Sequence, residues 1–179
     1  MLDVIMKYIT LLGEGGMIWI IFAVILICTK KYRKCGLMMG AALLLMLVIN
    51  DGILKNLIAR PRPFNRFDPA DPAMFAVWKD FPFPEIVSRP SSFSFPSGHT
   101  SSSFAAALPM LKTDKKIGIP ALVLAFLIGF SRIYVHVHYP TDVIVGAIAG
   151  LFYGWVGIVL VQKLEPVSYT HLRAHETTL

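Results

Sequence analysis

Residues 143–161 read VIVGAIAGLFYGWVGIVLV and carry no charged side chain. A helix that crosses a bilayer needs about 20 mostly apolar residues, so this run is long enough to span one. Three further uncharged runs have a similar character, at Gly15–Thr29, Gly36–Asn50 and Ile117–Ser131. A fifth run, Ser97–Leu111, is uncharged but rich in Ser and Ala, which makes it a weak span by hydropathy. These runs predict an all-α, polytopic membrane helical bundle of about five transmembrane helices.

The composition agrees with a membrane protein and excludes other classes. Of the 179 residues, 55% are hydrophobic and only 16% are charged, with a mean hydropathy of +0.63. A soluble domain carries roughly 25% charged residues, and a disordered chain is less apolar than this one. The two cysteines are too few for a disulfide scaffold. The net charge of +6 fits cytoplasmic loops and an anionic ligand better than nucleic acid.

The N-terminal residues 1–14 are expected to add a short helix to this bundle. Ile5, Ile9 and Leu12 lie at helical spacing, which suits a helix that lies in the membrane interface or packs beside the bundle. Together with the spans, these residues predict one membrane-embedded domain over residues 1–166.

Residues 167–179 differ in character from the rest of the chain. They are polar, resemble translated adapter or vector sequence, and are excluded from the predicted domain as foreign or disordered. His171 and His175 have the i,i+4 spacing of metal ligands, but no acidic residue or established helix supports a metal site there.

Basic loops predict the orientation of the spans. The links KKYRK at 30–34 and KTDKK at 112–116, and the exit QKLEP at 162–166, lie on one side if five spans alternate. Lys and Arg in short loops mark the cytoplasmic side. The connections 60–96 and 132–142 then face outward. In the first of them Asp71-Pro72 predicts the start of a short helix, and a loop packed on the protein is the alternative.

Ionisable residues at membrane depth are costly and tend to be functional, and here they form three clusters on the predicted outer side. In the first cluster, Lys55 and Arg62 are seven residues apart, about two helical turns. Pro61 and Pro63 end the helix there. The structural alternative is a pair of basic residues that reach from a helix end toward water.

The second cluster is Pro96-Ser97-Gly98-His99, directly before the Ala-rich run. Ser97 has the character of an N-cap, so free backbone N–H groups and the positive end of the helix dipole would face a bound anion. Gly98 permits close backbone approach, and His99 would lie within a phosphate-sized site. A capped helix with a histidine at the headgroups is the alternative.

The third cluster precedes the last span and contains Arg132, His138 and Asp142. Asp142 lies about one helical turn after His138, where its carboxylate can hold one imidazole nitrogen and make the other more nucleophilic. His136 should point elsewhere, and we assign it no catalytic role. A site in which His136 and His138 bind a metal lacks a third ligand of obvious spacing, and the neighbouring cations favour an anion.

In these residues the sequence closely resembles the type 2 phosphatidic acid phosphatase (PAP2) superfamily, which is related to vanadium haloperoxidases and the glucose-6-phosphatase group. The family pattern is Lys, six residues, Arg-Pro; then Pro-Ser-Gly-His; then Ser-Arg, five residues, His, three residues, Asp. The chain matches every position and their order across residues 10–163: Lys55, Arg62-Pro63, Pro96-Ser97-Gly98-His99, Ser131-Arg132, His138 and Asp142. The resemblance also implies a six-helix core, whose sixth helix residues 1–14 would supply.

The resemblance implies a role for each of these residues. His138 attacks phosphorus, Asp142 orients His138, and His99 protonates the leaving oxygen and then activates water. The remaining site residues bind the phosphate oxygens: Lys55, Arg62, Ser97, Gly98 and Arg132. Neither a metal nor another cofactor is implied.

The expected function is that of an integral-membrane lipid phosphatase in the inner (plasma) membrane, with its site on the outer side. Expected substrates are undecaprenyl pyrophosphate and phospholipid phosphates such as phosphatidylglycerophosphate or phosphatidic acid. Its partners would be this lipid and the bilayer, with no nucleic acid. A lipid phosphotransferase using the same site is one alternative, and a non-enzymatic transport protein or partner subunit is another.

Overall fold

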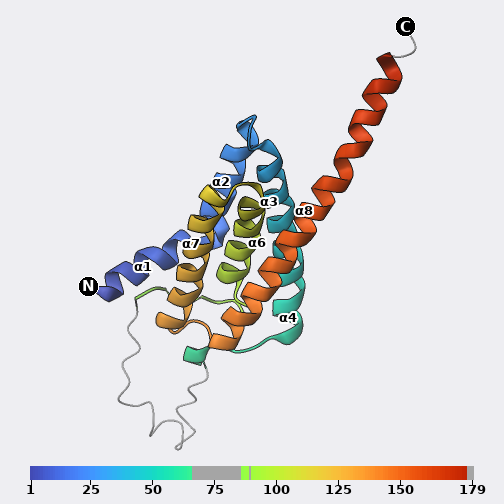
Figure 1. Cartoon of the computed structure of the whole chain (residues 1–179). Coiled ribbons are helices and arrows are strands. Elements are labelled where there is room, and N and C mark those ends of the chain that lie inside the picture. Colours follow the sequence, from blue (N-terminus) through green and yellow to red (C-terminus); the bar gives the residue numbers. More distant parts are fainter. Residues whose placement is uncertain (66–85, 89, 177–179) are drawn as a thin grey trace, which may run out of the picture.

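The computed structural model describes residues 1–65, 86–88 and 90–176, and these residues form helices and turns without a strand (Figure 1). The protein is thus an all-α integral-membrane bundle, as predicted. The helix expected after Asp71 lies outside the described residues. In chain order the elements are α1 (Leu2–Leu12), η1 (Glu14–Gly16), α2 (Met17–Cys28), α3 (Arg33–Leu45), η2 (Met46–Leu54), α4 (Lys55–Ile58), η3 (Pro63–Asn65), α6 (Gly98–Thr113), α7 (Lys115–Tyr134) and α8 (Pro140–Glu176).

Three stretches in the described part of the chain are long and apolar enough to cross a membrane: Arg33–Ile58, Lys115–Tyr134 and Pro140–Leu164. Helix α1 and the helix that follows it make a fourth candidate, bent by 43° at the break between them. The helix predicted at Gly36–Asn50 is longer than the sequence indicated. A π-helical segment, η2, continues it into α4.

The fifth predicted run forms α6, which is 16 residues long and occupies the centre of the bundle. Most of its Ser, Thr and Ala side chains are buried, and Ser103 accepts a hydrogen bond of 2.9 Å from the indole of Trp19 on α2. A helix that faces other helices instead of lipid needs small side chains more than apolar ones. This explains why hydropathy alone scores it weakly.

Glycines of α8 allow that helix to lie directly on α6. A Cβ added at Gly146, Gly150 or Gly154 would approach the carbonyl oxygens of Ser97, Ser101 and Ala105 to 2.9, 2.4 and 3.0 Å. The four-residue interval of these glycines matches the interval of the carbonyls that they face. This close contact fixes the start of α8 against the start of α6, where two of the polar clusters lie.

Helix α1 packs beside the bundle against the C-terminal end of α7. The Tyr134 hydroxyl donates to Asp3 Oδ1 at 2.6 Å, and Arg132 Nη1 donates to Thr10 Oγ1 at 2.6 Å. The predicted apolar stripe is displaced by one position, because Met6 and Thr10 are buried while Ile5 and Leu12 are exposed. The reason is that α1 meets α7 through polar contacts, which the apolar spacing does not reveal.

Helix α8 does not stop where the predicted domain ends. Its backbone continues as a helix to Glu176 and extends past the other helices, as the long red segment in Figure 1. The backbone of residues 167–176 belongs to this helix. Their foreign origin remains a prediction.

Candidate active site

The three polar clusters meet at one end of the bundle, around a cavity of about 260 Å³. The start of α6, the end of α7 and the segments after η2 and before α8 contribute to its wall. Ser97 and Asp142 are buried behind this wall. The other predicted site residues line the cavity itself: Lys55, Arg62, Gly98, His99, Arg132 and His138.

A buried carboxylate stands beside one nitrogen of His138. Asp142 Oδ2 is 3.5 Å from His138 Nδ1, and it also accepts hydrogen bonds from the Ser94 hydroxyl and, at 2.9 Å, from the Tyr139 backbone N–H. Burial lowers the pKa of His138 to about 4, although the hydrogen bond to Asp142 acts in the opposite direction. The imidazole is therefore neutral at pH 7, the state in which a ring nitrogen keeps a lone pair.

Arg62 contacts the other nitrogen of the same ring. Its Nη1 is 3.2 Å from His138 Nε2 and donates to the Val137 carbonyl at 2.9 Å. Its Nε and Nη2 donate to the carbonyl and hydroxyl of Ser92, at 2.6 and 3.0 Å. Because a guanidinium only donates, a hydrogen bond to Nε2 requires the ring proton on Nδ1, the side of Asp142. Burial lowers the pKa of Arg62 to about 10, which leaves it cationic at pH 7.

Arg60 holds the second oxygen of the same carboxylate. Its Nη1 donates to Asp142 Oδ1 at 2.6 Å and to Thr141 Oγ1 at 2.8 Å. The guanidinium also lies over the Tyr139 ring, 4.0 Å from the centroid, a cation–π arrangement. Asp142 thus has partners on both oxygens, and its orientation is fixed.

His99 lies in the first turn of α6, on another part of the cavity wall. Its Nε2 is buried and is 3.4 Å from Glu14 Oε2, within ion-pair distance but without hydrogen-bond geometry. The turn that carries Glu14 packs closely against the His99 ring, since a Cβ added at Gly13 would lie 2.8 Å from His99 Cδ2. Any group that binds between the two histidines therefore meets α1 and η1 on the His99 side.

The rest of the wall supplies positive charge. Lys55 Nζ forms an ion pair of 2.7 Å with Asp51, while Arg132 Nη1 donates to the neutral Thr10 hydroxyl. Arg132 Nε is buried and has no hydrogen-bond partner among the described residues. With Arg62, these cations suit a tetrahedral anion, since Arg and Lys are the usual phosphate-binding side chains.

Ser97 does not use its hydroxyl as the sequence predicted. It occupies the N-cap position of α6, but its side chain caps no backbone N–H and instead accepts from Thr100 Oγ1 at 2.9 Å. Its own backbone N–H donates to the Asp142 carbonyl at 3.1 Å. Gly98 does face the cavity, where a Cβ would lie 3.0 Å from Asp51 and 3.1 Å from Lys55. At this position the close backbone approach is real.

Sequence reasoning missed several residues that complete the site. Glu14 stands far from the motifs along the chain, and Ser92 and Ser94 lie in a Ser-rich segment with no distinctive spacing. Arg60 lies two residues before Arg62, but nothing in its spacing indicates its contact with Asp142. In the described part of the chain, no three His, Cys, Asp or Glu side chains are grouped to hold a metal ion.

A family model described as the PAP2 superfamily matches residues 31–166. The chain belongs to the PAP2 superfamily. The motifs quoted from the sequence lie within this match, and the structure brings them to one cavity.

Individual PAP2 relatives extend the similarity to nearly the whole chain. Undecaprenyl-diphosphatase BcrC of Bacillus subtilis is 29% identical over 99% of this chain and 84% of its own length. An undecaprenyl-diphosphatase of Sulfolobus acidocaldarius is 30% identical over 81% of this chain, which spans 63% of that relative. The crystal structure of a PAP2-type phosphatidylglycerolphosphate phosphatase from Bacillus subtilis superimposes with a TM-score of 0.65 and 28% identity, over 90% of this chain and 77% of that one.

Proposed function

We propose that this protein is a lipid phosphatase that hydrolyses the terminal phosphate of a membrane lipid through a phosphohistidine on His138. The observation that carries the proposal is the cavity in which His138 and His99 share one space with Lys55, Arg62 and Arg132. A neutral, oriented imidazole supplies a nucleophile, and cations stabilise the charge that spreads over the phosphoryl oxygens.

In the first step, His138 Nε2 attacks phosphorus. An N–P bond forms and the bond from phosphorus to the lipid oxygen breaks. His99, which becomes protonated when the anionic phosphate lies beside it, gives its proton to that oxygen. Asp142 stabilises the positive charge that develops on the His138 ring, because it faces the Nδ1 proton. Arg62 Nη1 leaves Nε2 when the phosphate enters and donates to a phosphoryl oxygen instead.

The second step returns the enzyme to its starting state. Neutral His99 removes a proton from water, the water oxygen bonds to phosphorus, and the N–P bond to His138 breaks. Inorganic phosphate leaves, and His99 is protonated again for the next cycle.

The lipid is proposed to be a polyprenyl diphosphate, processed at the outer face of the plasma membrane. Two relatives that bear the name undecaprenyl-diphosphatase support this choice. The outer location is supported by the position of the basic links next to Tyr32 and Asp114, at the end of the bundle opposite the cavity (Figure 1).

The test is phosphate release from undecaprenyl diphosphate by the purified protein in detergent, with a chelator in parallel. Wild type should release phosphate, and both His138→Ala and His99→Ala should abolish the release. Vanadate should inhibit wild type, because it occupies a phosphate site. Radioactive lipid labelled in the terminal phosphate should leave acid-labile label on wild type and none on His138→Ala.

His136→Asn provides the matched control. His136 has a positive φ of 56°, which Asn tolerates, and it does not line the cavity. This variant should keep wild-type activity. Label that appears in an acceptor lipid instead of free phosphate would indicate a phosphotransferase. Full activity of His138→Ala would overturn the proposal in favour of a non-enzymatic role.

A further inference from the structure

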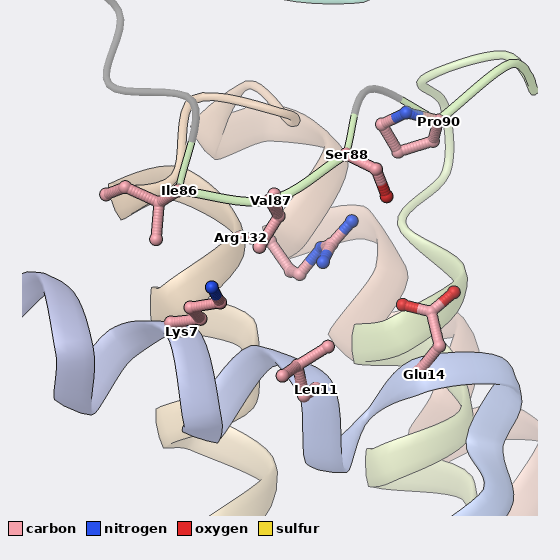
Figure 2. A pocket seen from close by; sticks show the side chains of 8 residues that line it. All are labelled: Lys7, Leu11, Glu14, Ile86, Val87, Ser88, Pro90 and Arg132. Carbon is pink, nitrogen blue, oxygen red and sulfur yellow. The ribbon is translucent and has the colours of Figure 1, made fainter.

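A second cavity, of about 360 Å³, adjoins the first on the side of α1 (Figure 2). Lys7 and Leu11 of α1 form one side of it, and Ile86 and Val87 form the other. Its volume far exceeds that of one phosphate group, and its lining combines charged and apolar side chains.

The two cavities adjoin each other near His99, because they share lining residues. Glu14 and Arg132 line both of them. Glu14 is also the side chain that stands 3.4 Å from His99 Nε2. Under the proposed function, His99 protonates the leaving group, so the second cavity lies on the side toward which the leaving group departs.

The described lining of the second cavity carries two basic side chains, Lys7 and Arg132, against one acidic side chain. Arg132 is 3% exposed, and its buried Nε has no hydrogen-bond partner in the described part of the chain. Lys7 forms no ion pair with any described residue, and Figure 2 shows its ammonium directed to the space beneath Ile86 and Val87. Glu14 is the acidic group of this lining, which leaves one net positive charge.

The position of Lys7 is fixed by the contacts of its own helix. Asp3, Lys7 and Thr10 lie at spacings of four and three residues, so they share one face of α1. Asp3 and Thr10 are each held to α7 at 2.6 Å, by Tyr134 and Arg132 respectively. Lys7 stands between these two anchors and faces the cavity.

We infer that the second cavity binds the second phosphate of a lipid diphosphate, the one that leaves with the lipid, through Lys7 and Arg132. This inference rests on the proposed function. Leu11, Ile86 and Val87 provide an apolar surface for the first carbons of the chain. The reacting phosphate occupies the histidine cavity, and the bridging oxygen lies at His99, where the departing phosphate needs its proton. The protein thereby selects diphosphates over monophosphates of the same lipid.

The test compares farnesyl diphosphate with farnesyl monophosphate, which differ only in the second phosphate. Lys7→Gln should lower kcat/KM for the diphosphate by about tenfold, because a charge-assisted phosphate contact is lost. The kcat/KM for the monophosphate should change by less than about twofold, as for an ordinary surface substitution. Lys7→Arg should retain the preference, and Lys7→Glu should weaken the diphosphate reaction further.

Lys115→Gln is the matched control, an exposed lysine at the opposite end of the bundle. It should change neither reaction. Equal losses on both substrates after Lys7→Gln, or no loss on either, would overturn the inference.

A binding measurement separates this inference from the proposed function. Methylenediphosphonate carries two phosphonates and is not hydrolysed, so its binding to the purified protein can be followed by calorimetry. Lys7→Gln should weaken its binding by about tenfold and leave orthovanadate binding unchanged. If wild type hydrolysed neither lipid, the proposed function would fail while this measurement still tested the subsite. Methylenediphosphonate affinity unaltered by Lys7→Gln would refute the subsite.

Discussion

Asp142 has partners on both of its carboxylate oxygens. A carboxylate buried this completely is stable only when its lone pairs are occupied. The donors are the Ser94 hydroxyl, the Tyr139 N–H and Arg60, and the remaining neighbour is His138 Nδ1. The carboxylate can therefore hold the imidazole in one tautomer without a change in its own position.

Replacing Asp142 by Asn should leave a small residual activity. The amide keeps the shape of the side chain but loses the charge that orients the His138 ring and stabilises it when it becomes cationic. We expect kcat to fall by about 10⁴-fold, as it does for orienting aspartates elsewhere. His138→Ala should be lower still, because no N–P bond can form. Equal, complete loss in two folded variants would contradict the orienting role.

Only part of this arrangement was predictable from the sequence. The four-residue spacing of His138 and Asp142 predicted their proximity, although His138 lies in the turn before α8 and not within the helix. Arg60, Ser94 and Glu14 were not predictable, since each reaches the site across a tertiary contact that no local spacing encodes.

The buried His138 should make the protein less stable in acid. Its pKa is about 4 in the folded protein against an ordinary value of 6.5, so the unfolded chain binds a proton first as the pH falls. The neutral His138 ring makes its full contribution to the free energy of unfolding above pH 6.5. This contribution is lost as the pH falls toward 4. The loss is roughly 3 kcal/mol, because one pKa unit corresponds to about 1.4 kcal/mol.

Thermal unfolding in detergent measures this effect. Between pH 7.5 and 4.5 the Tm of wild type should fall further than the Tm of His138→Gln, because that variant lacks the titrating group. Parallel pH curves for the two proteins would show that His138 does not titrate as described.

At the scale of elements, the pairing of α6 with α8 places the two histidine segments together. Gly150 makes the tightest of the α8 contacts, with a hypothetical Cβ 2.4 Å from the Ser101 carbonyl oxygen and 2.9 Å from Phe104 Cβ. A backbone oxygen in a packed helix cannot move aside, so one added methyl group forces the helices apart.

Gly150→Ala should therefore destabilise the bundle by about 1–3 kcal/mol, the usual cost of overpacking. Activity should fall as well, because Gly146 and Asp142 move with the same helix. Gly40→Ala is the control, since nothing lies within 4 Å of its Cβ and Ala favours a helix by up to about 1 kcal/mol. If both variants showed the same Tm, the close α6–α8 contact would not support stability.

The elements themselves were largely predictable, and the exceptions have physical causes. The lengths of the uncharged runs predicted α7 and α8, but they could not locate the π-helical segment η2 between Met46 and Leu54. Within this segment Asn50 accepts a tertiary hydrogen bond of 3.0 Å from Ser101, and Asp51 forms a local ion pair with Lys55, four residues further on. Asn50 thus bonds across the bundle, while Asp51 reaches the cavity.

The whole molecule is polar at both ends, and the two ends differ in kind. One end has the active-site cavity and the connection after α4. The other end has the basic links, joined where the Tyr32 hydroxyl donates to Asp114 at 3.0 Å. Contact with Tyr32 and the Lys116 backbone N–H lowers the pKa of Asp114, which keeps this carboxylate charged among the lysines. Because positive loops remain in the cytoplasm, the cavity should face outward.

A cysteine-labelling experiment in spheroplasts decides this orientation. Cys28 is exposed beside the basic links, whereas Ser91 is exposed at the cavity end and contributes no contact to the proposed machinery. A membrane-impermeant maleimide should label a Cys28→Ser, Ser91→Cys protein in intact spheroplasts. Wild type should be labelled at Cys28 only after permeabilisation, which also controls for thiol reactivity. The opposite pattern would place the cavity in the cytoplasm, because both thiols belong to one rigid bundle and must exchange sides together.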